Sequence, residues 1–124
     1  MTTGIIVFAH GSRVESANQA VRSVAAELAR AGGYTLVEAA FLELGQPDLV
    51  AAAAGLLHRG ADRLIVLPYF LTPGLHMERD LAPLIARISA AHPGIEVTAA
   101  PSLDGHPGLV QALLDRARAL DQST

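Results

Sequence analysis

The sequence predicts an α/β fold in which a four-stranded parallel sheet is flanked by helices. Two observations support this prediction. A continuous apolar run rich in β-branched residues occurs at residues 4–9, and a second apolar run follows Arg63 in the segment 63–68; both are typical of strands buried on both faces. Segments with apolar residues at helical spacing separate the strand-like segments, so the two patterns alternate along the whole chain.

The alternation defines eight elements. We expect strands at residues 4–9, 35–41, 63–68 and 95–100, and helices at residues 17–31, 47–57, 80–92 and 107–120. The first strand is continuously apolar and the third is apolar after Arg63, so we expect both to be buried on their two faces.

Residues that favour helix starts and stops set the helix boundaries. Gly32 and Gly33 end the first helix. The third helix is expected to begin near Asp80 as its N-cap, because Pro83 lacks a backbone N–H and is best tolerated in a first turn. The histidine, proline and glycine at 92–94 end that helix.

Composition limits the classes of function. A chain of 124 residues, 51% hydrophobic, is expected to form one domain, residues 1–124. The net charge of -3 and the lack of a basic cluster argue against nucleic-acid and membrane partners. Without cysteine, a bound metal needs nitrogen and oxygen ligands. The sequence has no signal-like N-terminus or long apolar run, so we expect a cytoplasmic protein.

Candidate functional residues follow the ends of the predicted strands. The carboxyl ends of parallel strands share one rim of a sheet, where ligands commonly bind. The six imidazole- or carboxylate-bearing residues in and next to these segments are His10, Glu43, His76, Asp80, Asp104 and His106. Such donors suit cobalt, nickel, zinc or ferrous iron, and a histidine also serves as a proton acceptor near neutral pH.

Structural roles compete with functional ones at several positions. Ser12 and Glu15 fit a capping box, so Ser12 either caps the first helix or contributes to a site. His58 and His92 end helices, where a cation favours the helix dipole, and we assign both to structure. His106 precedes a proline at a helix start and is interpreted as a loop or capping residue.

Other enzyme classes receive little support from the motifs. Neither a phosphate-binding GxxxxGK[ST] loop nor a GxGxxG turn is found in the chain. A phosphatase with a histidine nucleophile is conceivable, because a histidine after the first strand with an arginine nearby could bind phosphate. Ala9 precedes His10 where the histidine phosphatases carry arginine, which argues against that reaction.

Three of the rim segments together resemble the short CbiX-type chelatases of sirohydrochlorin. The matching segments are FAHGSR at 8–13, AFLEL at 40–44 with Pro47, PYFL at 68–71, GLH at 74–76, and Asp80. Each motif alone is weak, but their order and their positions at strand ends form a specific signal covering nearly the whole chain.

The resemblance implies a chelatase-like single domain that pairs into a homodimer and inserts a divalent metal into sirohydrochlorin for cobalamin or sirohaem synthesis. Co²⁺ is the favoured metal, with Fe²⁺ or Ni²⁺ as alternatives, and no organic cofactor is implied. By position, His10 is the proton acceptor and a metal ligand, with His76 and Glu43 as the other ligands. The substrate-binding residues implied are Gln46, Leu71, Thr72, Pro73, Gly74, Leu75 and His76.

One position departs from the family pattern, and one alternative function stays open. Gln46 stands where the family often has a glutamate, so an ionic role there is in doubt. Arg13 and Arg79 are hypothesised to meet substrate carboxylates. A non-catalytic carrier of metal or tetrapyrrole is the alternative function, because it would use the same two histidines, His10 and His76.

Overall fold

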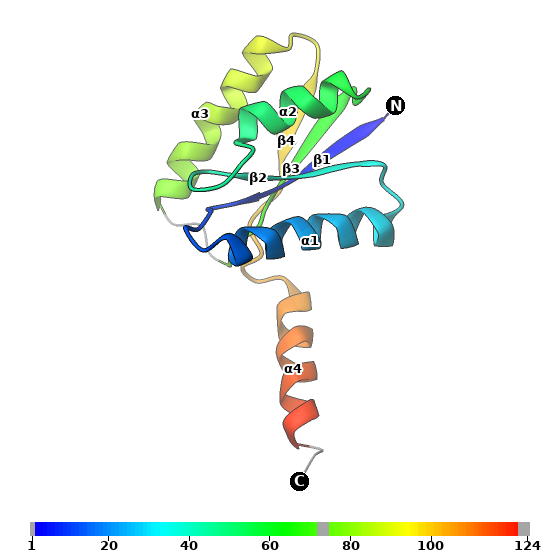
Figure 1. The fold of residues 1–124 in the computed structure, drawn as a ribbon, viewed down its shortest axis with the longest axis vertical. Helices are drawn as coiled ribbons and strands as arrows, with labels where there is room; N and C mark the ends of the chain where they lie inside the picture. The colour runs from blue at the N-terminus through cyan, green and yellow to red at the C-terminus, as the bar shows by residue number, and fades with distance from the viewer. Residues whose placement is uncertain (1, 72–74, 122–124) are drawn as a thin grey trace.

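Four parallel strands form one sheet in the order β2-β1-β3-β4 in the computed structural model (Figure 1). The elements are β1 (Thr3–Ala9), α1 (Glu15–Gly32), β2 (Leu36–Phe41), α2 (Leu49–His58), β3 (Arg63–Pro68), α3 (Leu75–Ala91), β4 (Glu96–Ala99) and α4 (Pro107–Asp121). The described residues are 2–71 and 75–121, except for the side chains of 75–78. The predicted fold class and the order of the elements are confirmed.

Strand β1 is buried on both faces, as the sequence predicts. Ile6 and Phe8 belong to a core that α2 and α3 cover, and both are fully buried. Val7 and Ala9 point to the opposite face, where they form a second core with residues of α1. The sheet therefore separates two cores, with β1 contributing alternate side chains to each.

The prediction that residues 63–68 are buried on both faces is wrong for this chain. Leu64 and Val66 of β3 are buried, whereas Ile65 and Leu67 are only half-buried. Leu67 pairs with Val7, so this less buried face of β3 is the face that α1 covers elsewhere. Helix α1 packs on β1 and β2. In the described part of the chain, no helix covers the same face of β3 and β4.

Helix α3 begins at Leu75, five residues before the expected start, and Pro83 lies inside it. An interior proline removes one backbone hydrogen bond and crowds the preceding turn. Leu81 before Pro83 and Leu84 and Ile85 after it pack against the core, and Ile88 is fully buried. Tertiary packing thus outweighs the unfavourable proline, which a local rule does not anticipate.

The two ends of α1 differ in how well the sequence predicts them. Gly33 ends the helix with φ of 70°, in the left-handed region that glycine favours. The capping-box prediction is wrong: α1 begins at Glu15, and its N-cap Val14 makes no side-chain capping bond. The Ser12 hydroxyl accepts a hydrogen bond from the Val14 N–H, while Glu15 pairs with Arg22.

Helix α4 does not lie against the sheet. It stands clear of the rest of the molecule as a separate arm (Figure 1), and none of its residues is buried. The expectation that helices flank the sheet is therefore met by α1, α2 and α3.

No helix in residues 2–71 and 75–121 combines the length and apolarity that crossing a membrane requires.

We predict that Asp48→Ala lowers the free energy of unfolding by about 1 kcal/mol, the usual cost of losing an N-cap. The Asp48 carboxylate caps α2 by accepting a hydrogen bond from the Ala51 N–H at 2.8 Å. Urea unfolding followed by circular dichroism measures the change. Asp48→Asn is the matched control, because its side-chain oxygen still accepts that bond. Equal loss in both variants would contradict the capping role.

Candidate functional site

The loops that leave β1 and β2 run side by side at the carboxyl rim of the sheet. The strand register pairs Ala9 with Phe41, and two backbone hydrogen bonds continue the pairing beyond it. The Leu42 N–H donates to the Ala9 carbonyl at 2.9 Å, and the Glu43 N–H donates to the His10 carbonyl at 3.1 Å. The backbone thereby brings His10 and Glu43 next to each other.

The side chains of His10 and Glu43 face each other across open solvent. His10 Nε2 lies 3.7 Å from Glu43 Oε1, and each side chain is 57% exposed. Two ligand atoms about 2.1 Å from one metal ion are at most about 4.2 Å apart, so this 3.7 Å spacing allows a shared cation. His10 Nδ1 lies 3.4 Å from the Gly11 carbonyl, which favours a proton on Nδ1 and a lone pair on Nε2.

Gly11 makes the close approach of the two loops possible. Its φ is 97°, a conformation that side chains with a Cβ rarely adopt. A Cβ at this position would lie 1.7 Å from the Glu43 carbonyl oxygen. The single glycine of the first turn therefore sets the distance between His10 and Glu43.

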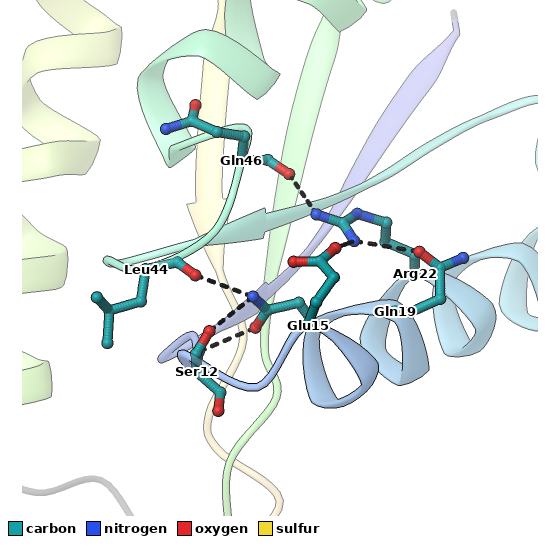
Figure 2. Close-up of polar contacts among 7 residues, drawn as sticks. Ser12, Glu15, Gln19, Arg22, Leu44 and Gln46 are labelled. Atoms are coloured by element: carbon teal, nitrogen blue, oxygen red, sulfur yellow. Dashed lines mark hydrogen bonds and ion pairs between the residues drawn. The ribbon is translucent and has the colours of Figure 1, made fainter.

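A buried amide fixes the two loops to each other. Asn18 of α1 is only 1% exposed. Its Oδ1 accepts from the Ser12 N–H at 2.9 Å, and its Nδ2 donates to the carbonyls of Ser12 at 2.8 Å and Leu44 at 2.9 Å. Figure 2 shows these bonds joining the backbones at Ser12 and Leu44, just beyond His10 and Glu43.

Arg22 forms a second connection between α1 and the loop after β2 (Figure 2). Its guanidinium lies over the Phe41 ring at 5.2 Å and donates to the Gln46 carbonyl at 3.0 Å. It also pairs with Glu15 at 2.6 Å. The Gln46 side chain itself is exposed at the rim.

The hydrogen bond from Arg22, with a smaller contribution from Asn18, lowers the pKa of Glu15 below its usual range. Because the folded pKa is the lower one, this contact stabilises the fold above the ordinary carboxyl pKa. Its contribution is lost as the pH falls through the lowered pKa.

A pocket of about 380 Å³ opens beside Glu43, between the loop after β2 and α3. Its lining residues are Leu42, Glu43, Asp80, Pro83, Leu84 and Arg87. The structure therefore brings two of the predicted rim carboxylates, Glu43 and Asp80, to one hollow. Arg87 adds a cation to the same hollow.

The predicted site residues of the third loop are described only in part. Leu71 is 63% exposed and lines an apolar pocket of about 320 Å³ with Tyr69, Phe70, Leu103 and Leu109. Thr72, Pro73 and Gly74 lie outside the described residues. Leu75 and His76 belong to the first turn of α3 rather than to a loop, and their side chains are also outside the description.

The histidines assigned to structure occupy the expected positions. The His106 ring caps α4, because its Nδ1 accepts from the Gly108 N–H at 2.9 Å. His58 lies in the last turn of α2, and His92 directly follows α3. Among residues with described side chains, no three His, Asp or Glu groups gather closely enough to hold a metal ion.

The two residues that join the loops, Asn18 and Arg22, are not among the sequence-derived candidates. A signal for Asn18 exists: it is a polar residue in register with the buried Val21 and Ala25 on one face of α1. A buried amide on an apolar stripe needs hydrogen-bond partners, which points to a structural junction. Arg22 carries no comparable signal in the sequence.

The fold and the site define an α/β protein with an imidazole and a carboxylate at the carboxyl rim of a parallel sheet, where this class binds its ligands. A family model described as CbiX matches residues 4–120. The chain therefore belongs to the CbiX family, and the resemblance found in its motifs is confirmed.

Curated relatives carry chelatase names. The chain is 33% identical over 113 residues to the chloroplastic sirohydrochlorin ferrochelatase of Arabidopsis thaliana, covering 91% of this chain and 50% of that protein. It is 36% identical over 78 residues to the sirohydrochlorin cobaltochelatase of Sulfolobus acidocaldarius, covering 63% of this chain and 62% of that protein. The chain thus spans about half to three fifths of the length of these relatives.

Solved structures share the fold. A putative cobalamin biosynthesis CbiX protein from Marinobacter aquaeolei superposes with a TM-score of 0.83 at 24% identity, covering 98% of this chain and 99% of that chain. The sirohydrochlorin chelatase SirB from Bacillus subtilis subspecies spizizenii, in complex with cobalt, gives a TM-score of 0.87 at 25% identity. That superposition covers 96% of this chain and 51% of the SirB chain.

We predict that Asn18→Leu lowers the free energy of unfolding by about 2–4 kcal/mol, since each buried polar group left unsatisfied costs about 1–3 kcal/mol. The variant removes the side-chain partner of the Ser12 N–H and of two carbonyls. Urea unfolding measures the loss. Ser16→Ala, an exposed position in the same helix, is the matched control and should behave as the parent protein. A change at Asn18 within about 0.5 kcal/mol, as for ordinary surface substitutions, would refute the junction.

Proposed function

We propose that this protein inserts a divalent metal ion into sirohydrochlorin, for cobalamin or sirohaem synthesis. Co²⁺ is the favoured substrate metal, with Fe²⁺ or Ni²⁺ as alternatives. The observation that carries the proposal is the His10–Glu43 pair, 3.7 Å apart and open to solvent, in a chain of the CbiX family. The names of the relatives from Arabidopsis and Sulfolobus support sirohydrochlorin as the substrate.

Metal insertion exchanges one M²⁺ for two pyrrole protons, so the site must accept protons and loosen water from the metal. His10 Nε2 carries the lone pair for the first proton, because Nδ1 faces the Gly11 carbonyl, and the second proton passes to solvent water at this exposed rim. Glu43 then stabilises the imidazolium that forms, at a spacing already suited to an ion pair. The exchange balances in charge and transfers no electrons, so the proposed reaction needs no organic cofactor.

The loop after β3 and the first turn of α3 complete the proposed site. His76 is proposed as the second imidazole ligand, and Glu43 as the carboxylate ligand beside His10. Apolar residues after β3 suit a flat macrocycle, and the exposed Leu71 fits this role. The proposed substrate-binding set is Gln46, Leu71, Thr72, Pro73, Gly74, Leu75 and His76.

A homodimer is part of the proposal. A tetrapyrrole is large relative to a domain of 124 residues, and the rim that carries His10 and Glu43 is open to solvent. A second copy would help to enclose the substrate and exclude water, which strengthens charge interactions at the site.

The proposal predicts turnover rather than stoichiometric binding. With Co²⁺ and sirohydrochlorin in excess over the protein, the visible spectrum should change for many equivalents, faster than without protein. His10→Ala should lower the rate by about 10²–10⁴-fold, the usual contribution of a general base. His58→Ala, which removes a histidine at the far end of α2, is the matched control and should keep the parental rate.

A spectral change that stops at one equivalent would instead support the carrier function. Equal rates for His10→Ala and the parent protein would remove His10 from the mechanism. Parallel assays with Co²⁺, Fe²⁺ and Ni²⁺ identify the preferred metal.

Arg13 provides a separate prediction about substrate binding. It is exposed three residues after His10, and sirohydrochlorin carries many carboxylates. Arg13→Ala should raise KM for sirohydrochlorin about two- to five-fold with kcat unchanged, matching the ~0.5–1 kcal/mol of an exposed ion pair. Arg30→Ala, at the opposite end of α1, controls for loss of charge. An unchanged KM would exclude the contact.

A further inference from the structure

Leu44, directly after Glu43, has an unfavourable backbone conformation. Its φ is 60°, and among the described residues it is the only one other than glycine with a positive φ. Residues with a Cβ avoid this left-handed region, and a side chain that is 50% exposed gains little from burial to offset the cost. Other contacts must therefore hold Leu44 in this conformation.

The contact that holds Leu44 comes from the buried amide of α1. Asn18 Nδ2 donates to the Leu44 carbonyl at 2.9 Å, a bond that Figure 2 shows. Gly45 lets the chain pass close over this amide, since a Cβ there would lie 3.1 Å from Asn18 Nδ2 and 2.9 Å from the Phe41 ring. The turn after Glu43 is thus built against one side chain of α1.

The same amide fixes the loop that carries His10. Asn18 accepts from the Ser12 N–H at 2.9 Å and donates to the Ser12 carbonyl at 2.8 Å. Both backbone groups of Ser12, two residues after His10, are therefore held by one side chain. An ionised aspartate could not donate to either carbonyl, and an aliphatic side chain could make none of the three bonds.

The spacing of the His10–Glu43 pair has little tolerance. The two facing atoms lie 3.7 Å apart, and one metal ion with ligand bonds of about 2.1 Å bridges at most about 4.2 Å, which leaves a margin of about 0.5 Å. Both side chains are more than half exposed. The backbone positions of the two loops, rather than side-chain packing, therefore set this spacing.

We propose that Asn18 is a positioning residue for metal capture. By holding the backbones of Ser12 and Leu44, its amide keeps the two loops at a separation at which one cation can bridge the His10–Glu43 pair. Asn18 is 1% exposed, so it acts through the pair and does not contact the ion. The inference rests on the proposed function, which assigns this pair to a divalent metal.

The test measures Co²⁺ binding to the protein alone by calorimetry, without tetrapyrrole. Asn18→Leu should raise the Kd about 10–100-fold, the usual effect of removing a residue that orients a metal ligand. Leu36→Ala is the matched control, because it removes a buried side chain at the opposite end of β2 from Glu43 and also destabilises the fold. This control should keep the parental Kd, and circular dichroism establishes that both variants are folded during the assay.

A double-mutant cycle shows whether Asn18 acts through the pair. In a Glu43→Ala background, Asn18→Leu should change the Kd less than about two-fold, because the spacing no longer matters once one partner is removed. An effect of equal size in both backgrounds would mean that Asn18 acts by another route, which overturns the positioning role.

Asn18→Asp provides a second variant if Asn18→Leu does not fold. It keeps an acceptor for the Ser12 N–H but loses the donors to the Ser12 and Leu44 carbonyls. It should therefore also raise the Kd for Co²⁺, by about ten-fold or more.

Failure of this inference is distinct from failure of the proposed function. A parental Kd in the Asn18 variants, with binding lost in His10→Ala, would overturn the positioning role and leave the metal site in place. A parental Kd in His10→Ala would contradict the proposed metal site itself. Turnover of sirohydrochlorin is measured separately: the expected Co²⁺ results without turnover by the parent protein would contradict the chelatase reaction alone.

Discussion

The need to shield β1 from water on both faces governs the arrangement of this protein. Six consecutive residues of β1 are buried, so helices must cover the sheet from both sides. This requirement places β1 inside the sheet, between β2 and β3, and fixes its register with both. It also fixes the place of the chemistry, because His10 emerges where the buried strand ends and Glu43 emerges beside it from β2.

Much of this arrangement follows from the sequence because the strand signal is strong and the rim is a consequence of topology. An apolar run such as residues 4–9 has few ways to satisfy its burial other than as an inner strand. Once the strands are parallel, His10 and Glu43 must lie at the same edge. Their 3.7 Å spacing does not follow from the pattern, since it depends on Gly11 and the backbone bonds between the two loops.

The expectations that fail are local patterns overruled by contacts distant in sequence. In a capping box, the Glu15 carboxylate would bond back to the Ser12 N–H. Here Asn18 already accepts from that N–H, and Arg22 holds Glu15 instead. The early start of α3 has the same origin, because core packing of residues after Pro83 stabilises a helix that extends in front of it.

The burial pattern of β3 has a different origin from the failed capping-box prediction and the early start of α3. Its apolar run predicts cover on two faces, the chain provides cover on one, and no competing contact explains the difference. The same chain carries α4, in which the apolar residues Val110, Leu113 and Leu114 are exposed. The half-buried face of β3 and the exposed apolar residues of α4 are unusual together in a chain of this size, since exposed apolar area of this kind promotes association. Residues 63–68 are therefore buried on the face that α2 and α3 cover, and in the described part of the chain no helix reaches the opposite face of this strand.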